Sequence, residues 1–599
     1  MTATETSSTE SKLPTNSQSA PVILALTIER FRGIKTLSWH PERGVNIILG
    51  GGDTGKTTVL DAIALLLSPT NPSVLAESDY FERDIKSEFV ISAVLELPPS
   101  TNISRQFRTS WPWAWDGSKA IVPTVPADGK TVDRPVYCLR VRGTEDLEIL
   151  YELVHPDGTS VPLSVSLRRA IGLVRLSGDD RNDRDLRLVQ GSALDRLLTD
   201  PALRSRMSSA LASNDISMSL LEPGQAALRD LDRQFEQRGL PKGLDLAITG
   251  GQGVSIASLV GLTAKRSNTK LPLVSWGAGT RRLAALTIAE QNQATNPIVL
   301  VDEVERGLEP YRQRVLTGRL EAAESQTFLT THSPCVLSAV RASKIWYLDA
   351  SGSLGKLDGA KVRSHLASDP EAFLSRLALV VEGLTEVGFV THLLEKALSA
   401  PLRTYGIHVT DGKGHETCLE LLGALSGAGL QFGGFVDDED GKHPEAWGRL
   451  EKRSGPLLFR WKSGCVEMNM ISALPDSKLE ALLLDPEDEK TGLRLRTLSE
   501  RLGIVERTYQ DIRAKAGSEF RELLIGAALG SVPPNIDEKE EKKKYKSHSQ
   551  CWFKSRSGGE ELAEKMFVLD AWPSLKGQLL PFCNAVRRLV RLPDLTDLP

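Results

Sequence analysis

The N-terminal part of the chain alternates short apolar runs with polar turns. Between Ile23 and Leu49 the runs are ILALTIERF, IKTLSW and VNIILG, a pattern typical of strands. The glycine-rich segment GGGDTGKTT follows directly, and the apolar-rich VLDAIALLL after it favours a helix. The pattern therefore predicts three strands, a glycine-rich turn and a helix, in that order.

The pattern of apolar and charged residues changes further along the chain. Residues 90–165 are strand-rich, with FVISAVLEL, RPVYCLRV and LEILYELV as the clearest runs, whereas residues 167–235 carry Arg, Leu, Asp and Ala at helical spacing. Near Leu377 the strand LALVVEG opens a second α/β region that ends at about Leu474. Helical segments follow, and the charged stretch DEKEEKKKYKSHSQ predicts an exposed loop.

Length and composition indicate a multidomain cytoplasmic protein. The chain has 599 residues, more than one hydrophobic core usually supports, and it has no run of about 18 apolar residues, so we expect no membrane span. Residues 1–20 have no apolar block of the kind that a secretory signal needs, and we interpret them as a disordered tail. The six cysteines form no C-x-x-C pair, as expected for reduced thiols in the cytosol.

The net charge of -4 lacks the basic excess of a small DNA-binding protein. A surface for nucleic acid must therefore be a local basic groove, and the sequence leaves open that there is none.

The glycine-rich turn matches a phosphate-binding loop in full. Residues 50–57 read G-x-x-x-x-G-K-T, between a predicted strand and a predicted helix. In such a loop the backbone N–H groups face the phosphates, Lys56 reaches the β- and γ-phosphates, and the Thr57 hydroxyl coordinates Mg²⁺. The predicted nucleotide-binding residues here are Gly50, Gly52, Gly55, Lys56, Thr57 and Thr58.

A phosphate-binding loop needs an acidic partner at the end of another strand. The apolar run IVLV ends in Asp302 and Glu303. We expect Asp302 to hold the Mg²⁺ and Glu303 to polarise the attacking water.

Two further motifs resemble ABC-type ATPases of the SMC and RecF kind. Ser275 to Thr280 (SWGAGT) precede a predicted helix, and His332 lies about thirty residues after the acidic pair, with RGLEP at the place of that family's D-loop. The resemblance implies that Ser275 and Gly277 of one subunit close over ATP bound by the other, and so a homodimer or a higher even oligomer. An ordinary helix N-cap and a loop histidine are the alternatives. SWGAG in place of S-G-G argues against the transporter subfamily, and no Q-loop glutamine is evident.

Acidic residues follow two strands of the second α/β region. Glu382 ends the strand LALVV with Glu386 four residues later, and GGFV ends in Asp437, Asp438, Glu439 and Asp440. Acids at the carboxyl ends of two parallel strands predict a magnesium site. A helix start next to an acidic turn is the alternative.

The spacing E-G-x-x-E, then D-x-[DE] about fifty residues later, resembles the Toprim domain. The order of an ABC ATPase, a helical insertion and a Toprim domain resembles the OLD family of nucleases (overcoming lysogenization defect), which includes the Gabija-type defence nucleases. The resemblance implies that Glu382, Glu386, Asp437 and Glu439 bind Mg²⁺ or Mn²⁺, with Asp438 or Asp440 as the other register. It also implies Glu467 at a second metal position and Lys554 as the basic residue that stabilises the charged transition state. A surface acid and a solvated lysine are the alternatives for these two residues. The loop Asp411 to Glu416 either contacts this site or is a plain turn.

The predicted fold class is α/β, with a P-loop ATPase, a helical insertion and a Toprim domain that ends in helices. The predicted domains are a tail (1–20), an ATPase lobe with the phosphate-binding loop (21–166), a helical insertion for dimerisation or DNA contact (167–245), a second ATPase lobe (246–360), the Toprim core (361–475) and its helical completion (476–599).

The predicted function is an ATP-binding and ATP-hydrolysing, metal-dependent DNA endonuclease, in DNA processing or anti-phage defence. A partner protein encoded alongside is a hypothesis that follows from the family resemblance. The catalytic candidates are Glu303, Glu382, Asp437 and Lys554. The alternative is an ATP-gated DNA clamp or sensor whose Toprim domain does not cleave. A topoisomerase or primase is disfavoured because the sequence has no zinc motif.

Overall fold

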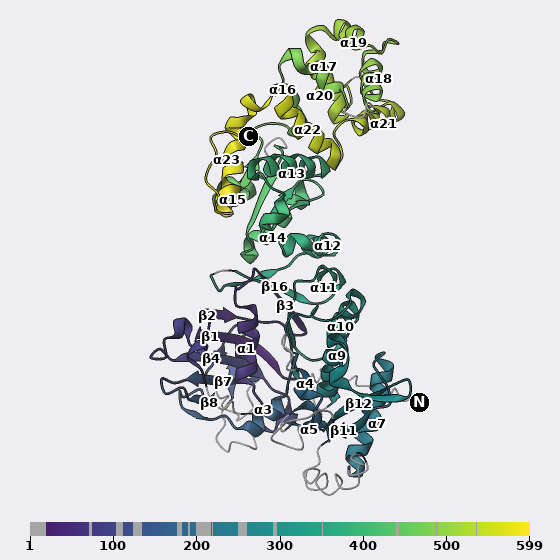
Figure 1. The fold of residues 1–599 in the computed structure, drawn as a ribbon. Coiled ribbons are helices and arrows are strands. Elements are labelled where there is room, and N and C mark those ends of the chain that lie inside the picture. The colour runs from purple at the N-terminus through teal and green to yellow at the C-terminus, as the bar shows by residue number, and fades with distance from the viewer. Residues whose placement is uncertain are drawn as a thin grey trace, which may run out of the picture. The chain divides into compact units, whose positions relative to one another are not determined.

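The protein is described here by a computed structural model. The chain forms two compact units, Met1–Leu354 and Gly355–Pro599 (Figure 1). The boundary predicted from the sequence lies close by, after residue 360. The structure describes residues 20–598 except 71–74, 104–111, 124–133, 177–181, 190–191, 199–216, 218–219, 249–259, 292–295, 350, 439–441, 486–488 and 535. Most of the predicted N-terminal tail, and Glu439 and Asp440, lie outside the described residues.

A parallel sheet forms the centre of the first unit. Its strand order is β10-β14-β15-β3-β16-β17, and the first five strands run parallel to one another. All four residues of both β14 and β15 are buried, as expected for strands covered on both faces. The strands are β3 (Val45–Gly50), β10 (Leu173–Leu176), β14 (Ile298–Val301), β15 (Thr327–Thr330), β16 (Lys344–Leu348) and β17 (Leu354–Leu357), through which the chain enters the second unit.

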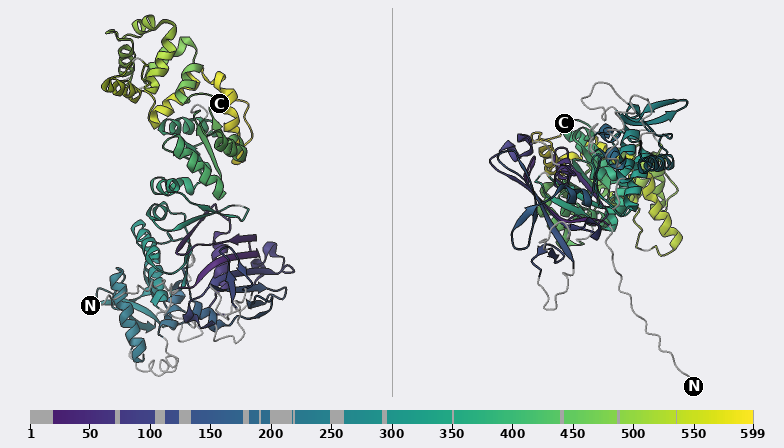
Figure 2. Two further views of the ribbon diagram at one scale, coloured as in Figure 1. Left: turned by 180° about the vertical axis from the view of Figure 1, so that it is seen from behind. Right: turned by 90° about the horizontal axis from the view of Figure 1, so that it is seen from below.

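An antiparallel sheet covers the helix that follows β3. Helix α1 (Lys56–Leu66) lies between the two sheets and contacts strands of both (Figure 2). Its buried Val59, Leu60 and Ile63 share one core with residues of the antiparallel sheet and of β3, β14, β15 and β16. The antiparallel strands are β1 (Val22–Phe31), β2 (Ile34–Trp39), β4 (Phe89–Glu96), β5 (Trp113–Trp115), β6 (Ala120–Ile121), β7 (Pro135–Gly143), β8 (Ile149–Val154) and β9 (Ser160–Pro162).

The region predicted as a helical insertion is mixed in structure. Strand β10 lies inside residues 167–245 but pairs with β14, so it belongs to the central sheet. Helix α7 (Glu222–Gln237) buries Leu228, Leu231 and Phe235 along one face and contacts α9 (Ala278–Gln291). The other elements of the unit are α3 (Val165–Ile171), α4 (Asn182–Asp185), α5 (Ala193–Leu198), α7 (Glu222–Gln237), β11 (Asp245–Ile248), β12 (Val260–Arg266), β13 (Thr269–Pro272), α9 (Ala278–Gln291), α10 (Pro310–Ala322) and α11 (Pro334–Ala339).

The second unit is built on a four-stranded parallel sheet of order β19-β18-β20-β21. Every residue of the two central strands is buried, and helices α13 and α14 both contact the sheet. The elements are β18 (Leu377–Val381), α13 (Leu384–Leu398), β19 (Ile407–Asp411), α14 (His415–Ala428), β20 (Phe432–Val436), α15 (Pro444–Ser454), β21 (Leu458–Arg460) and α16 (Val466–Ala473), preceded by α12 (Ala360–Ser368).

The C-terminal helices share the core of this sheet. Their apolar residues pack in one cluster with those of β18 and α13, and Figure 1 shows the yellow helices α22 and α23 beside α13 and α15. Buried Arg494 of α18 donates two 2.8 Å hydrogen bonds to Glu561 of α22. The helices are α17 (Leu479–Leu483), α18 (Thr491–Leu502), α19 (Tyr509–Ala516), α20 (Phe520–Leu529), α21 (Lys539–Ser547), α22 (Arg556–Val568) and α23 (Trp572–Leu589).

Helices α13 and α22 pack backbone against backbone. A Cβ atom on Gly388 of α13 would collide with the carbonyl oxygen of Arg556, and one on Gly559 of α22 would collide with that of Thr385. The Thr385 hydroxyl also donates to the Phe553 carbonyl at 2.9 Å. This contact fixes the segment around residue 554 against the start of α13.

The charged stretch predicted as an exposed loop is largely helical, so that prediction was wrong. Helix α21 covers Lys539–Ser547 and buries none of its residues. Exposure was predicted correctly. In the described part of the chain no helix is both long enough and apolar enough to cross a membrane.

Candidate functional site

The phosphate-binding loop has the conformation that its glycines predict. Asp53 and Gly55 both adopt positive φ, 57° and 98°, and α1 begins at Lys56. A Cβ at Gly50 would lie 2.6 Å from the carbonyl oxygen of Leu348 on β16, so only glycine fits there. The N-terminus of α1, which carries partial positive charge, therefore opens directly onto the loop.

Lys56 is buried and folds back over this loop. Its Nζ donates to the carbonyl oxygens of Gly50 at 3.0 Å and Gly51 at 2.6 Å. Burial lowers the pKa of Lys56, and the nearby carboxylates of Asp302 and Asp53 partly offset that shift. These carbonyls hold the ammonium group at the place where it would contact the phosphates of a bound nucleotide.

Asp302 faces the loop across one intervening strand. Because β15 lies between β3 and β14, the ends of those two strands are about 10 Å apart, a gap that side chains can span. The Thr57 hydroxyl donates to Asp302 Oδ1 at 3.2 Å. Thr57 and buried Asp302 thus meet where the Mg²⁺ of a bound nucleotide is expected, and their oxygens suit that ion.

The hydroxyl of Thr330, at the end of β15, connects both acids of this motif. It donates to Asp302 Oδ1 at 2.6 Å and accepts from the Glu303 backbone N–H at 2.9 Å. Glu303 has φ 48°, a left-handed conformation that is uncommon for a side chain of this size. The sequence analysis missed Thr330, although its place at the end of a strand beside the acidic pair was a usable signal.

Buried Arg282 of α9 holds the segment after β14 in place. Its guanidinium donates to the carbonyl oxygens of Glu303 at 2.6 Å, Arg306 at 3.0 Å and Asp302. Burial lowers the pKa of Arg282 to about 10. Since a Cβ on Gly279 would collide with the Gly307 carbonyl, the start of α9 and the predicted D-loop approach each other backbone to backbone.

The predicted signature residues lie on the surface. Ser275 and Gly277 are exposed just before α9, and the Ser275 hydroxyl donates to the Pro272 carbonyl at 2.7 Å. His332 is also exposed, and its backbone N–H donates to Glu305 at 2.7 Å. Within the described residues, neither the Ser275 nor the His332 side chain forms a hydrogen bond or ion pair with the phosphate-binding loop, and Ser275, Gly277 and His332 are all accessible to another molecule.

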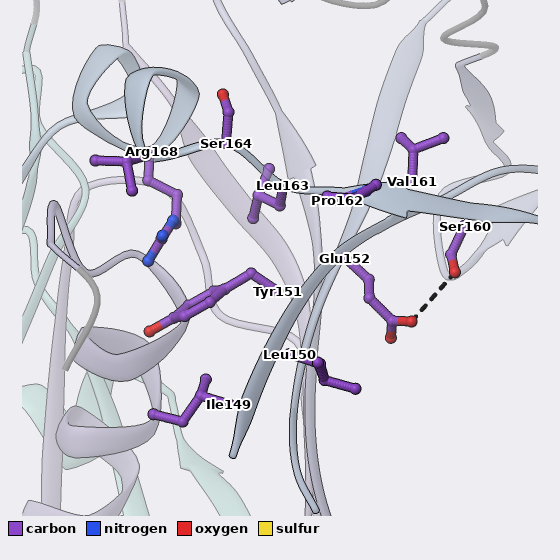
Figure 3. Close-up of a pocket in the computed structure, with 11 residues that line it drawn as sticks. Ile149, Leu150, Tyr151, Glu152, Ser160, Val161, Pro162, Leu163, Ser164 and Arg168 are labelled. Carbon is purple, nitrogen blue, oxygen red and sulfur yellow. Dashed lines mark hydrogen bonds between the residues drawn. The ribbon is translucent and has the colours of Figure 1, made fainter. Parts of the chain in front are cut away.

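The first unit also has a pocket of about 480 Å³ beside the far end of α1 (Figure 3). The Arg168 guanidinium stacks 3.6 Å from the centre of the Tyr151 ring. Tyr151 donates to the Leu65 carbonyl at 3.1 Å and Arg168 to the Ser68 carbonyl at 2.9 Å. These contacts brace the C-terminal end of the helix, and none of the predicted site residues lines the pocket.

The acids of the second unit lie at the point where the order in which strands are added to its parallel sheet reverses. After β18 the chain adds β19 on one side, and it then crosses to add β20 and β21 on the other. In open α/β sheets, ligands bind in the crevice at such a switch point, outside the carboxyl ends of the strands. Glu382 follows β18 and Asp437 follows β20, and the Asp437 backbone N–H donates to Glu382 Oε1 at 2.9 Å.

Glu386 and Glu467 lie beside this pair and are buried. Glu386 lies in the first turn of α13, and Gly383 leaves room for its carboxylate, because a Cβ there would lie 3.2 Å from Oε2. Glu467 lies in the first turn of α16 with a fully buried side chain. Lys554 Nζ lies 2.6 Å from Glu467 Oε1. Helices α13, α16 and the start of α22 therefore bring all of these predicted residues together.

The pKa values show how crowded these carboxylates are. Burial, and then the carboxylate of Glu467, raises the pKa of Glu386 to about 7. Burial, followed by the charges of Glu386, Glu382 and Glu467, raises the pKa of Asp437 to about 9. Burial disfavours the charged form of Lys554, but Glu467 outweighs burial and raises its pKa.

Two further observations bear on a bound cation. Asp437 Oδ1 and Glu467 Oε2 are buried without a hydrogen-bond partner among the described residues. Within the same residues, no three His, Cys, Asp or Glu side chains already have the arrangement of metal ligands. Oxygen-rich, buried and short of hydrogen bonds, the cluster fits Mg²⁺ or Mn²⁺ in its chemistry.

The structure distinguishes the members of the DDED sequence that it describes. Asp438 turns to Arg460 at the end of β21, with Arg460 Nη2 2.6 Å from its Oδ1. Asp437 faces the acidic cluster instead. This favours Asp437 over Asp438 as the acid of the cluster, while Glu439 and Asp440 lie outside the described residues.

The loop Asp411 to Glu416 contacts this site, so it is more than a plain turn. His415 Nδ1 lies 3.0 Å from Glu382 Oε1, and Trp447 Nε1 donates to His415 Nε2 at 3.2 Å. No sequence motif pointed to Trp447, which lies more than thirty residues further along in α15.

The comparisons with known proteins support part of this description. Residues 156–338 match the family model of an AAA domain described as a putative AbiEii toxin of a type IV toxin–antitoxin system. That range contains the signature segment, the acidic pair and His332. The first unit contains an AAA-type P-loop ATPase domain.

Two curated proteins are similar in sequence. The uncharacterized protein YbjD of Escherichia coli strain K12 is 25% identical over 429 residues, which cover 62% of this chain and 72% of that protein. The DNA replication and repair protein RecF of Nitrosococcus oceani is 48% identical over 44 residues, 7% of this chain and 12% of that protein.

Two solved structures each cover 57% of this chain. An SMC head bound to the C-terminal winged-helix domain of ScpA is 16% identical, with 99% of that chain covered. The recombination mediator protein RecF is 14% identical, with all of that chain covered. The TM-score is 0.35 in both cases, so the ATPase assignment rests on the loop geometry and the family match.

Proposed function

We propose that the chain is an ATP-hydrolysing, metal-dependent DNA endonuclease whose cleavage site is the acidic cluster of the second unit. The observation that carries the proposal is the meeting of Glu382 and Asp437 at the switch point of the β19-β18-β20-β21 sheet. Buried Glu386 and Glu467 surround them, and Lys554 adds a positive charge. The cluster follows an ATPase domain along the chain, and this order agrees with the resemblance to the OLD family and to Toprim domains.

The side chains have distinct roles in this proposal. Glu382, Glu386 and Asp437, with Glu439, would hold the first Mg²⁺ or Mn²⁺, and Glu467 would serve a second position. Such ions supply a water nucleophile and stabilise the leaving oxygen of a phosphodiester. Lys554, held by Glu467 at 2.6 Å, would offset the charge that develops on the phosphate.

The first unit would use ATP to join two copies of the chain. Asp302 and Thr57 lie where Mg²⁺ is expected, and Glu303 follows directly, so one protomer supplies the catalytic acids. Ser275, Gly277 and His332 are exposed and free to reach the nucleotide of a second protomer. We therefore propose a homodimer or a higher even oligomer that closes on ATP and opens after hydrolysis, in DNA processing or anti-phage defence.

A cleavage assay tests the proposal. Purified full-length protein is incubated with linear, nicked and supercoiled DNA, with Mg²⁺ or Mn²⁺, and with or without ATP. We expect metal-dependent cleavage that Glu382→Ala and Asp437→Ala each abolish. Asp438→Ala is the matched control, because Asp438 pairs with Arg460 outside the cluster, and it should retain cleavage.

The outcome also separates this proposal from the ATP-gated DNA clamp. DNA binding that depends on ATP, with no cleavage of any of the three substrates under either metal, would contradict the nuclease and support the clamp. Cleavage that survives both cluster variants would place the active site elsewhere.

A further inference from the structure

His415 occupies a buried position between the acidic cluster and the core. It is the first residue of α14, and its side chain is 4% exposed. The loop before it is fastened to the end of β18, since Gly412 N–H donates to the Val381 carbonyl at 2.7 Å and Gly414 N–H to the Glu382 carbonyl at 2.8 Å. Both the backbone and the side chain of Glu382 therefore contact this segment.

The hydrogen bonds of His415 determine which of its nitrogens carries the proton. The indole N–H of Trp447 can only donate, so Nε2 of His415 must be the acceptor of that 3.2 Å bond. The imidazole proton then lies on Nδ1, which is 3.0 Å from Glu382 Oε1 and donates to it. Trp447 is fully buried, so this arrangement is shielded from water.

Glu382 Oε1 consequently has two donors, the His415 ring and the Asp437 backbone N–H. Two donors at one oxygen fix the plane of the carboxylate and leave Oε2 free for a cation. Partners of this kind orient the ligands of a metal and are worth about 10- to 100-fold in metal affinity.

We propose that His415, locked by Trp447 as a neutral Nδ1–H donor, is a positioning residue that orients Glu382 for binding the divalent cation. The inference rests on the proposed function, because it assigns Glu382 to the metal. In this proposal His415 acts through Glu382 and is not itself a ligand of the cation.

The test measures Mn²⁺ binding to the full-length protein by electron paramagnetic resonance, beside cleavage of supercoiled DNA. We expect His415→Ala to weaken Mn²⁺ binding by about 10- to 100-fold. His415→Asn, whose amide N–H can stand near the Nδ1 position, should stay within about threefold of the wild type. This rescue separates orientation of Glu382 from a merely structural role.

Two further variants complete the design. Trp447→Phe keeps an aromatic ring but removes the N–H, so it should weaken Mn²⁺ binding less than His415→Ala does. His443→Ala removes a histidine that is half-exposed and bonded to Glu416, so it should bind as the wild type does.

The outcomes distinguish the inference from the proposed function. Wild-type protein that neither binds Mn²⁺ nor cleaves DNA would overturn the proposed function. Wild-type binding and cleavage, with His415→Ala equal to wild type in Mn²⁺ affinity, would overturn only the inference. Equal loss in His415→Ala and His415→Asn would also overturn it.

Discussion

The hydroxyl of Thr330 is shared by the two acids that follow β14. It donates to the Asp302 carboxylate and accepts from the Glu303 backbone, so a single side chain sets the position of both. Removing it leaves the Glu303 backbone N–H without this acceptor and leaves Asp302 Oδ1 with only the 3.2 Å bond from Thr57, at a cost of about 1–3 kcal/mol.

We predict that Thr330→Val slows ATP hydrolysis at least about tenfold, since ~1.4 kcal/mol corresponds to a factor of ten. Nucleotide binding should change little because Lys56 and the loop are intact. Steady-state phosphate release and binding of a fluorescent nucleotide measure the two effects. Thr317→Val is the control, because among the described residues that buried hydroxyl bonds only within its own helix, to the Gln313 carbonyl at 2.8 Å. Equal hydrolysis by Thr330→Val and wild type would contradict this role.

The raised pKa of Asp437 makes stability depend on pH. Its pKa is about 9 in the folded chain, against 3.8 in the unfolded chain. The folded state therefore keeps a proton that the unfolded state releases, and stability falls as pH rises from about 4 to 9. Glu386 acts in the same direction up to about pH 7.

We predict that Asp437→Asn unfolds at a higher temperature than the wild type at pH 8 without divalent cations, and at a similar temperature at pH 5. Asparagine is neutral at every pH, so the variant avoids the free-energy cost of keeping Asp437 protonated at pH 8, which is on the order of a few kcal/mol. Added Mg²⁺ should stabilise the wild type more than the variant. Differential scanning calorimetry at both pH values measures this, and a variant less stable than wild type at pH 8 would contradict it.

Several of these residues could be predicted from the sequence and others could not. Lys56, Thr57 and Asp302 belong to motifs whose spacing is set by a loop of fixed length or by the end of a strand. Thr330 and Trp447 act through hydrogen bonds between segments that are distant in the chain. Only the position of Thr330 at the end of a strand hints at its role, and nothing local marks Trp447. Ser275 and His332 were predicted as ATP ligands, and the geometry of one protomer leaves that prediction untested.

At the scale of elements, the contact between α13 and α22 positions the acidic cluster. Glu386 lies in the first turn of α13 and Lys554 just before α22, and the two helices approach as closely as Gly388 and Gly559 allow. A side chain at either glycine forces the helices apart.

We predict that Gly388→Ala destabilises the second unit by about 1–3 kcal/mol or more, because overpacking strains a close backbone contact. Gly423→Ala in α14 is the control. Nothing lies within 4 Å of its Cβ position, so it should be neutral or should stabilise the helix by up to ~1 kcal/mol. Urea unfolding measures both, and similar midpoints for the two variants would contradict the role of the glycine contact.

Helix α21 shows where charge alone was a poor guide to structure. A dense run of Lys and Glu predicted an exposed loop, yet the run forms a helix with acids in its first turn and lysines in its last. That order suits the helix dipole, and Lys and Glu are good helix formers. The charge pattern indicated exposure correctly but carried no information against a helix.

At the scale of the whole chain, the strand order of both parallel sheets could not be predicted from the sequence. The acids at the ends of predicted strands indicated at which edge of each sheet the site lies. They did not indicate which strands are neighbours. In the first unit, β15 lies between the strands of the two nucleotide motifs. In the second, the switch between β18 and β20 brings Glu382 to Asp437. Only long-range packing determines these orders.

The exposed signature residues lead to a prediction about assembly. Glu303→Gln should bind ATP without hydrolysing it, and so should accumulate as a dimer or a higher even oligomer in ATP. Lys56→Ala should remain in the state of the nucleotide-free protein, because it lacks the charge that holds the phosphates. Sedimentation velocity measures both, and a Glu303→Gln protein whose size is the same with and without ATP would contradict an ATP-closed dimer.

The most direct test of the account is the anomalous scattering of Mn²⁺ in crystals of the full-length protein. The account predicts a peak at coordination distance, about 2 Å, from carboxylate oxygens of both Glu382 and Asp437. That peak should be absent from crystals of Asp437→Asn. Manganese bound only at other positions, or no peak between β18 and β20 at saturating Mn²⁺, would contradict it.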